Sequence, residues 1–234
     1  MLCAFLIRLV LAFVVVLQPR GIAAQLKDQT QVAPTNDLPN PYERQWPWGE
    51  LPDGSYDNRA SFIGVEEGPD GNIYVLSRCF QNSCTGRAEA PVVKLNQSGT
   101  LLTSWGSGMF DFPHGFDIDD SGNVWTADQR GHRVMKWTAE GQLLLTIGER
   151  GDAGDPPQRL SEPTDVVIAT NGDIFITEGH SFSDGVNRVS KFSSDGSFVM
   201  SWGTTGSGAG EFNVPHAIAI DSQDRVFVGD RGNN

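Results

Sequence analysis

The feature that most constrains the fold is a unit that recurs about every 50 residues along the chain. Each unit has a tight turn, followed at once by a short segment rich in β-branched and aromatic residues. The four turns are Asp70-Gly71, Ser121-Gly122, Asn171-Gly172 and Gln223-Asp224. The segments that follow them span residues 72–75, 123–126, 173–176 and 225–228. Short strands bounded by such turns predict an all-β protein.

Each of the first three units predicts four strands, because two more β-type segments and a second glycine turn follow. One four-stranded sheet cannot bury both of its faces, so such units stack around an axis as blades of a β-propeller. A flat sandwich also has alternating strands, but it has no phased repeat of this length. We therefore expect a propeller over residues 57–234. Asp128 and Asp230 end equivalent strands, and we expect both to be structural.

The fourth unit ends early, because only residues 217–220 and 226–228 supply strand-like segments in it. The chain is therefore expected to cover about three and a half blades. Two absent strands would leave an open sheet edge, which stable propellers avoid. We expect the sequence to be a C-terminally incomplete fragment.

The N-terminus resembles a signal peptide over residues 1–24. One basic residue, an apolar run and the small residues Ala23 and Ala24 follow one another in the expected order. The apolar run is too short to span a bilayer comfortably, so no stable membrane insertion is expected after cleavage. Residues 25–56 form a polar, proline-rich leader or linker. These features predict a secreted protein, either periplasmic or extracellular.

The charge of the chain disfavours several classes of partner. Cleavage after residue 24 would remove Arg8 and Arg20 from the 17 basic residues and none of the 29 acidic ones, leaving a net charge of −14. Such a surface repels phosphate backbones and anionic lipids. We therefore expect no nucleic-acid binding, whereas calcium or cationic partners are compatible.

Two cysteines, Cys79 and Cys84, remain after the expected cleavage. In an oxidising compartment this spacing suits a small disulfide-closed loop. A metal site is less expected, because no histidine or second cysteine pair lies nearby.

Two of the units open with the same Pro-His pair, at His114 and His216. The innermost strand of every blade lines the axial channel, so both imidazoles are expected to point at one axis. Neutral imidazole is a good ligand for Zn²⁺, although two histidines do not complete a site. The alternative is that each histidine begins its strand and only hydrogen-bonds a loop.

These Pro-His pairs and their repeat context resemble peptidyl-α-hydroxyglycine α-amidating lyase, a family of NHL-repeat propellers, over about residues 60–234. The resemblance implies a six-bladed propeller that cleaves peptidyl-α-hydroxyglycine to a peptide amide and glyoxylate. It implies a zinc ion held by three histidines, of which His114 and His216 match two, with the third beyond Asn234. The substrate would be a peptide or a small amide.

The resemblance also assigns two arginines and a calcium site. Arg78 follows the second strand of the first unit, and Arg231 lies in an Asp-Arg-Gly-Asn segment that matches the family closely. Guanidinium groups at these positions would bind the substrate carboxylate and the departing glyoxylate. A structural Ca²⁺ would be held partly by the main-chain carbonyls of Val65 and Phe116, with its carboxylate ligand beyond the end of this sequence.

One departure from the family lies at His180, where the family has a tyrosine that acts as base or metal-linked phenolate. The imidazole could serve as the base, could become an extra metal ligand, or could mark a relative that has lost the reaction. The alternative function is a non-enzymatic secreted propeller that binds a peptide, glycan or protein. A calcium-dependent hydrolase of the lactonase kind is disfavoured, since histidine, threonine and histidine open the strands.

Overall fold

The computed structural model describes residues 39, 41–43, 48–49, 60–80, 82–181 and 185–233. The expected signal peptide lies outside these residues, as does most of the expected leader. Within the described ranges every element is a strand, and none of them contains a helix that is long and apolar enough to cross a membrane.

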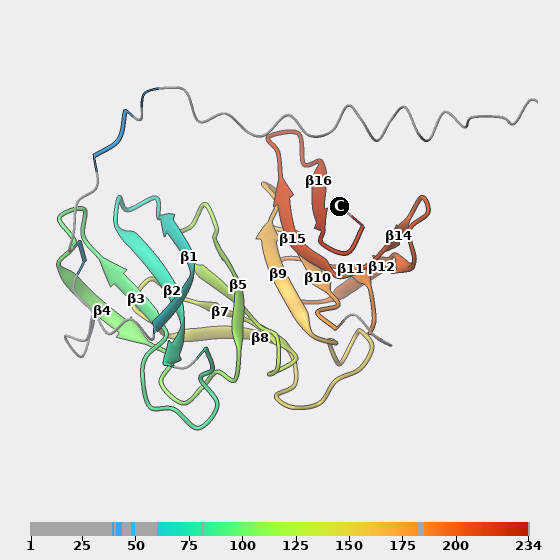
Figure 1. The fold of residues 1–234 in the computed structure, drawn as a ribbon, viewed down its shortest axis with the longest axis horizontal. Helices are drawn as coiled ribbons and strands as arrows, with labels where there is room; N and C mark the ends of the chain where they lie inside the picture. The colour runs from blue at the N-terminus through green and yellow to red at the C-terminus, as the bar shows by residue number, and fades with distance from the viewer. Residues whose placement is uncertain are drawn as a thin grey trace, which may run out of the picture. The chain divides into compact units, whose positions relative to one another are not determined.

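The strands form three four-stranded antiparallel sheets and two smaller pairs (Figure 1). The first sheet contains β1 (Ala60–Glu67), β2 (Ile73–Phe80), β3 (Val92–Leu95) and β4 (Leu101–Trp105). The second contains β5 (Pro113–Ile118), β6 (Val124–Asp128), β7 (Arg133–Trp137) and β8 (Leu143–Gly148). The third contains β9 (Pro163–Ile168), β10 (Ile174–Glu178), β11 (Arg188–Phe192) and β12 (Phe198–Trp202). The pairs are β13 (Thr204–Thr205) with β14 (Glu211–Phe212), and β15 (Pro215–Ile220) with β16 (Val226–Asp230).

The arrangement is that of a partial β-propeller. In each large sheet the strands follow one another in chain order, which is the order of a propeller blade. The first strands of successive blades, β1, β5, β9 and β15, contact one another and lie at the centre in Figure 1. Among the described residues the chain thus forms three complete blades and two strands of a fourth, as the repeat predicted.

Apolar side chains fill the space between consecutive blades. In the cluster between the first two blades Phe110 stacks on Trp137 of the second blade at 5.9 Å, and Tyr74 and Trp105 of the first blade meet edge to face at 6.4 Å. Similar clusters join the second blade to the third and the third to the strands of the fourth. Each fully buried large apolar side chain stabilises the fold by about 1.5–3 kcal/mol, so stacking holds the blades together.

Glycine turns allow neighbouring blades to pack closely against each other. Gly141, between β7 and β8, has a φ of +88°, and a Cβ there would lie 2.6 Å from Cγ of Trp105 in the preceding blade. A side chain at this position is excluded both by the left-handed backbone and by the indole ring. This contact gives a physical reason for the second glycine turn of the repeat.

A carboxylate at the end of each later second strand, buried in Asp128 and Glu178 and half-buried in Asp230, holds the segment that enters its blade. Oδ1 of Asp128 accepts a hydrogen bond from Phe112 N at 2.7 Å, and Oδ1 of Asp230 accepts one from Asn213 N at 2.8 Å. Oε2 of Glu178 accepts from Ser161 N at 2.7 Å in the third blade. The expected structural role of the two aspartates agrees with these bonds, which fix the segments leading to both Pro-His pairs.

Gly115 allows the second and third blades to approach at the axis, and its replacement by alanine is expected to destabilise the protein. A Cβ at this position would lie 2.4 Å from Cα of Asp165 and 2.8 Å from the carbonyl oxygen of Thr164. Because both atoms belong to the backbone, the clash with the added Cβ can be relieved only if the blades shift. We expect the free energy of unfolding, measured with urea, to fall by about 1–3 kcal/mol. Gly208→Ala is the control, since the nearest atoms there belong to the flexible end of Glu211. Equal stability of the two variants would contradict the prediction.

Candidate active site

Three imidazoles meet at the centre of the partial propeller. The ring centroids of His114 and His216 are 4.5 Å apart, and His180 lies 5.0 Å from His114 and 5.6 Å from His216. The nearest ring nitrogens of all three lie within 4.8 Å of one another. One small cation placed between them could therefore contact all three histidines after minor side-chain adjustment.

A β-bulge at the start of each inner strand aims these side chains. Pro113 pairs with Asp128, but the next pair is Gly115 with Ala127, so His114 is the extra residue. The same register shift makes His216 the extra residue of β15. Such bulges bend the strand and redirect one side chain, and they occur often beside active sites. The Pro-His pairs therefore place histidine at bulges that face the axis.

His180 reaches the same point from a different element. It lies two residues after Glu178, the last residue of β10, and so at the end of the second strand of its blade. The corresponding bulge of that blade, in β9, carries Thr164 instead of histidine. Thr164 contributes through its carbonyl, which lies 2.7 Å from Nδ1 of His114.

The Thr164 contact determines which nitrogen of His114 is free to bind a ligand. The carbonyl can only accept, so Nδ1 carries the proton and donates it, leaving a lone pair on Nε2. Nε2 is buried and has no hydrogen-bond partner among the described residues. A buried ring nitrogen without a hydrogen-bond partner lowers the stability of the fold. A histidine that binds a metal through one ring nitrogen, while the other donates to a backbone carbonyl, has this same arrangement.

The surroundings favour the neutral form of all three imidazoles. Burial, followed by the repulsion that a protonated His216 would exert and by the charge of Arg78, lowers the pKa of His114 to about 3. Burial also lowers the pKa of His216, with Arg231 as the next cause, and the pKa of His180, although Glu162 opposes the shift there. Neutral imidazole is the form that binds metal ions, so this donor set fits zinc.

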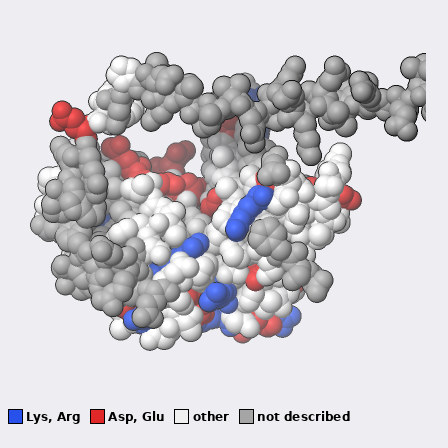
Figure 2. All heavy atoms as spheres, viewed as in Figure 1, with Lys and Arg blue, Asp and Glu red and all other residues white. Residues whose placement is uncertain are grey.

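The predicted arginines lie beside this cluster. Nε of Arg78 donates to the carbonyl of Pro113 at 2.9 Å, and its guanidinium lies 4.2 Å from the ring centre of Phe112. Arg231 lies close enough for its charge to contribute to the lowered pKa values of His216 and His180. Figure 2 shows Lys and Arg side chains across the middle of one face of the molecule, over the region of β5 and β9.

A third arginine of this region, Arg130, was not predicted from the sequence. Its guanidinium lies 4.6 Å from the ring centre of Phe112, which it shares with Arg78, and it is exposed. Its charge contributes to the lowered pKa of both Arg78 and His180, in each case after burial. A signal was present, because an arginine precedes a glycine shortly after the strand-ending aspartate both here and at Arg231.

A cavity of about 490 Å³ connects the cluster with a group of acidic residues. Arg78, His114 and His216 line it, together with Glu66 and Asp165. The two residues expected to offer main-chain ligands to calcium, Val65 and Phe116, line the same cavity. Their position beside carboxylates is compatible with a cation, and it remains a prediction that one binds there.

The carboxyl groups of this cavity are expected to make stability depend on pH. Burial, with the charges of Asp117 and Asp165, raises the pKa of Glu66 from 4.5 to about 7. The folded protein therefore holds more protons than the unfolded chain between these values, and this contribution to stability is lost as pH rises through 7.

In chelator-treated protein, raising the pH from 5 to 8 should therefore increase the free energy of unfolding of Glu66→Gln by about 1–3 kcal/mol relative to that of the wild type. Urea unfolding of both proteins at the two pH values measures the gain. Calcium added at pH 8 should stabilise the wild type more than the variant. A difference between the proteins that does not change with pH would contradict the assigned shift.

Comparison with known proteins gives the following similarities. A family model for the NHL repeat matches residues 110–137. Peptidylglycine alpha-amidating monooxygenase of Rattus norvegicus is 30% identical over 219 residues, covering 86% of this chain and 22% of the rat protein. A probable peptidyl-alpha-hydroxyglycine alpha-amidating lyase of Caenorhabditis elegans is 32% identical over 143 residues, covering 59% of this chain and 40% of the worm protein. The solved structure of streptogramin B lyase has a TM-score of 0.55 at 15% identity, over 77% of this chain and 51% of that one.

The chain thus forms a partial β-propeller, matches the NHL repeat over residues 110–137, and is similar in sequence to peptidyl-α-hydroxyglycine α-amidating lyases, as the resemblance indicated. The streptogramin B lyase structure supports the propeller fold alone. The chain spans less than half the length of the two relatives, 22% of one and 40% of the other.

Proposed function

We propose that the protein is a zinc-dependent carbon–nitrogen lyase that cleaves peptidyl-α-hydroxyglycine to a peptide amide and glyoxylate. The observation that carries the proposal is the three-imidazole cluster, with its buried, unpartnered Nε2 on His114, beside Arg78 in one cavity. The similarity of the chain to named lyases of this kind supports the same reaction.

In this proposal His114 and His216 hold the zinc ion together with His180, which takes the place that the resemblance gave to a histidine beyond Asn234. Three protein nitrogens and one open position are the usual donor set of a catalytic zinc site. The metal would act as a Lewis acid toward an oxygen of the substrate. The ring distances of 5.0 and 5.6 Å from His180 to the other histidines support a ligand role for it over the role of a base.

The arginines orient the substrate and the product. Arg78 and Arg231 would bind the carboxylate of the α-hydroxyglycine, which becomes the carboxylate of glyoxylate. The hydroxyl loses its proton, the C–N bond breaks, and the amide nitrogen takes up a proton as it leaves. Fixed positive charges beside the carboxylate cost no reorganisation during this step.

A structural Ca²⁺ near the carbonyls of Val65 and Phe116 belongs to the same proposal, supported by Glu66 and Asp165 in that cavity. Export of the protein is likewise proposed, on the signal-like residues 1–24.

The test is release of glyoxylate from an α-hydroxyglycine-terminated peptide by the full-length protein. The assay is run as purified, after chelation with EDTA, and after return of Zn²⁺. We expect chelation to stop release and zinc to restore it. Folded, zinc-loaded protein that releases no glyoxylate would overturn the lyase proposal and leave the alternative of a propeller that binds a peptide, glycan or protein.

His180→Phe separates the two roles of His180 in the same protein. As a ligand, its loss should weaken zinc affinity by at least about 10-fold, measured by competition with a chromogenic chelator. As a base alone, its loss should lower kcat while zinc affinity stays at its wild-type value. A lower kcat with unchanged zinc affinity would show that His180 acts as the base and is not a zinc ligand.

A further inference from the structure

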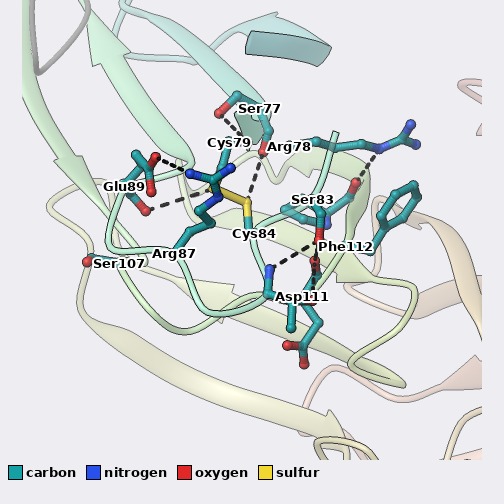
Figure 3. Close-up of a disulfide and its surroundings, with 12 residues drawn as sticks. Ser77, Arg78, Cys79, Ser83, Cys84, Arg87, Glu89, Ser107, Asp111 and Phe112 are labelled. Atoms are coloured by element: carbon teal, nitrogen blue, oxygen red, sulfur yellow. Dashed lines mark hydrogen bonds and ion pairs between the residues drawn. A yellow bond between two sulfur atoms is a disulfide. The ribbon is translucent and has the colours of Figure 1, made fainter. Parts of the chain in front are cut away.

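The disulfide between Cys79 and Cys84 lies directly beside a residue of the proposed site. Cys79 follows Arg78 in the chain, and both half-cystines are buried, with 4% and 3% exposure. Figure 3 shows the disulfide between the end of β2 and the segment that contains Asp111 and Phe112. We call Cys79, Asn82, Ser83, Cys84 and Thr85 the disulfide loop.

The far end of the disulfide loop is attached to the segment that leads to His114. Cys84 N donates to the carbonyl of Asp111 at 3.0 Å, and the hydroxyls of Ser83 and Thr85 donate to the same carbonyl at 3.4 and 3.3 Å. The amide of Asp111 donates in turn to the buried carboxylate of Asp128. Three donors on one carbonyl oxygen join the loop to the entry of the second blade.

Arg78 is held between the disulfide loop and that same entry segment. Its Nε donates to Pro113 O at 2.9 Å and its Nη1 to Oδ1 of Asn82 at 3.3 Å. Asn82 belongs to the loop, and Pro113 precedes the metal-site candidate His114. The direction of the guanidinium therefore depends on the position of the loop relative to the second blade.

The backbone of the disulfide loop adopts conformations that an open chain would seldom keep. Cys79 has a φ of 52°, in the left-handed region, which cysteine seldom adopts because its Cβ crowds the backbone there. Such residues persist only where the surrounding structure determines them. A ring closed over so few residues removes the extended alternatives that an open segment would sample.

We propose that the disulfide loop is a positioning device that fixes the Arg78 guanidinium for binding a carboxylate beside the three-histidine cluster. The ligand class rests on the proposed function, in which the carboxylate is that of the α-hydroxyglycine. Opening the disulfide releases Asn82 and lets Arg78 turn away from Pro113. Substrate binding then weakens, while the histidines and their metal stay in place.

The test compares the double variant Cys79→Ser/Cys84→Ser with the wild type in full-length, zinc-loaded protein. We expect the KM for the α-hydroxyglycine peptide to rise about 10-fold, as for loss of one charge-assisted contact, with kcat within 3-fold and an unchanged zinc content. Asn82→Ala keeps the disulfide and should raise KM about 3-fold. Arg87→Ala removes a 3.6 Å ion pair with Glu89 outside the ring and is the matched control, with KM within 2-fold. A double variant with the wild-type KM would overturn the proposal.

A second measurement does not depend on activity. The Nε–H of Arg78, identified in ¹⁵N spectra by its loss in Arg78→Lys, should exchange slowly with solvent in the wild type because it donates to Pro113. In the double serine variant it should exchange at least about 10-fold faster. Equal exchange rates in a folded double variant would overturn the positioning role even if the protein proves not to be a lyase. Faster exchange without glyoxylate release by the wild type would support the positioning role and reject the proposed reaction.

Discussion

Replacement of His114 by alanine is expected to remove bound zinc and to lower kcat/KM for glyoxylate release by at least about 1,000-fold. His114 is the most constrained of the three histidines, because Thr164 fixes its tautomer and its free Nε2 is buried. Metal analysis by mass spectrometry and the glyoxylate assay on the same sample measure the two effects.

His132→Asn is the matched control for this prediction. His132 belongs to the same blade but lies outside the cluster, where its Nδ1 accepts a hydrogen bond from Glu162 N at 3.1 Å. Its φ of 54° is one that asparagine tolerates. We expect this variant to keep its zinc and its activity within about 3-fold of the wild type. Full zinc occupancy in the His114→Ala variant would contradict the ligand assignment.

The largest effect on stability is expected for Glu178→Ala, which should lower the free energy of unfolding by about 3–5 kcal/mol. The carboxylate is fully buried and accepts two hydrogen bonds from Arg188 at 2.9 Å, one from the Ser190 hydroxyl and one from Ser161 N. Alanine would remove two of the acceptors of the nearly buried guanidinium, which keeps Asp155 and the carbonyl of Gly154, and would leave the backbone amide of Ser161 without its carboxylate acceptor. Urea unfolding monitored by tryptophan fluorescence measures the loss.

Asp173→Ala tests whether burial causes this effect. Asp173, directly before β10, pairs with Lys191 of β11 at 2.6 Å, but both side chains are partly exposed. A pair of this kind contributes about 0–1 kcal/mol, so the control should lose at most that amount. If the two variants are equally stable, the Glu178 network does not hold the third blade together.

The repeat was sufficient to predict the blades. Turns such as Asn171-Gly172 and the apolar segments after them have local causes, namely the left-handed turn conformation and the pairing of β-branched residues. The same pattern placed His114 and His216 at the start of inner strands, because equivalent positions of a repeat occupy equivalent places in the blades. The disulfide between Cys79 and Cys84 could be predicted because they are the two cysteines that remain after the expected cleavage and their spacing suits a small loop.

The meeting of His180 with the other histidines was decided by the tertiary structure. His180 follows a second strand, whereas His114 and His216 sit in bulges of first strands, so no shared repeat position connects them. Their ring distances depend on the angle between blades, which follows from close approaches such as Gly115 against Asp165. The attachment of the disulfide loop to Asp111 likewise joins two blades. The blades and their inner strands could be predicted from the sequence, because they follow from local turn chemistry and short-range pairing. Only the packing of one blade on the next determined which side chains share the axis.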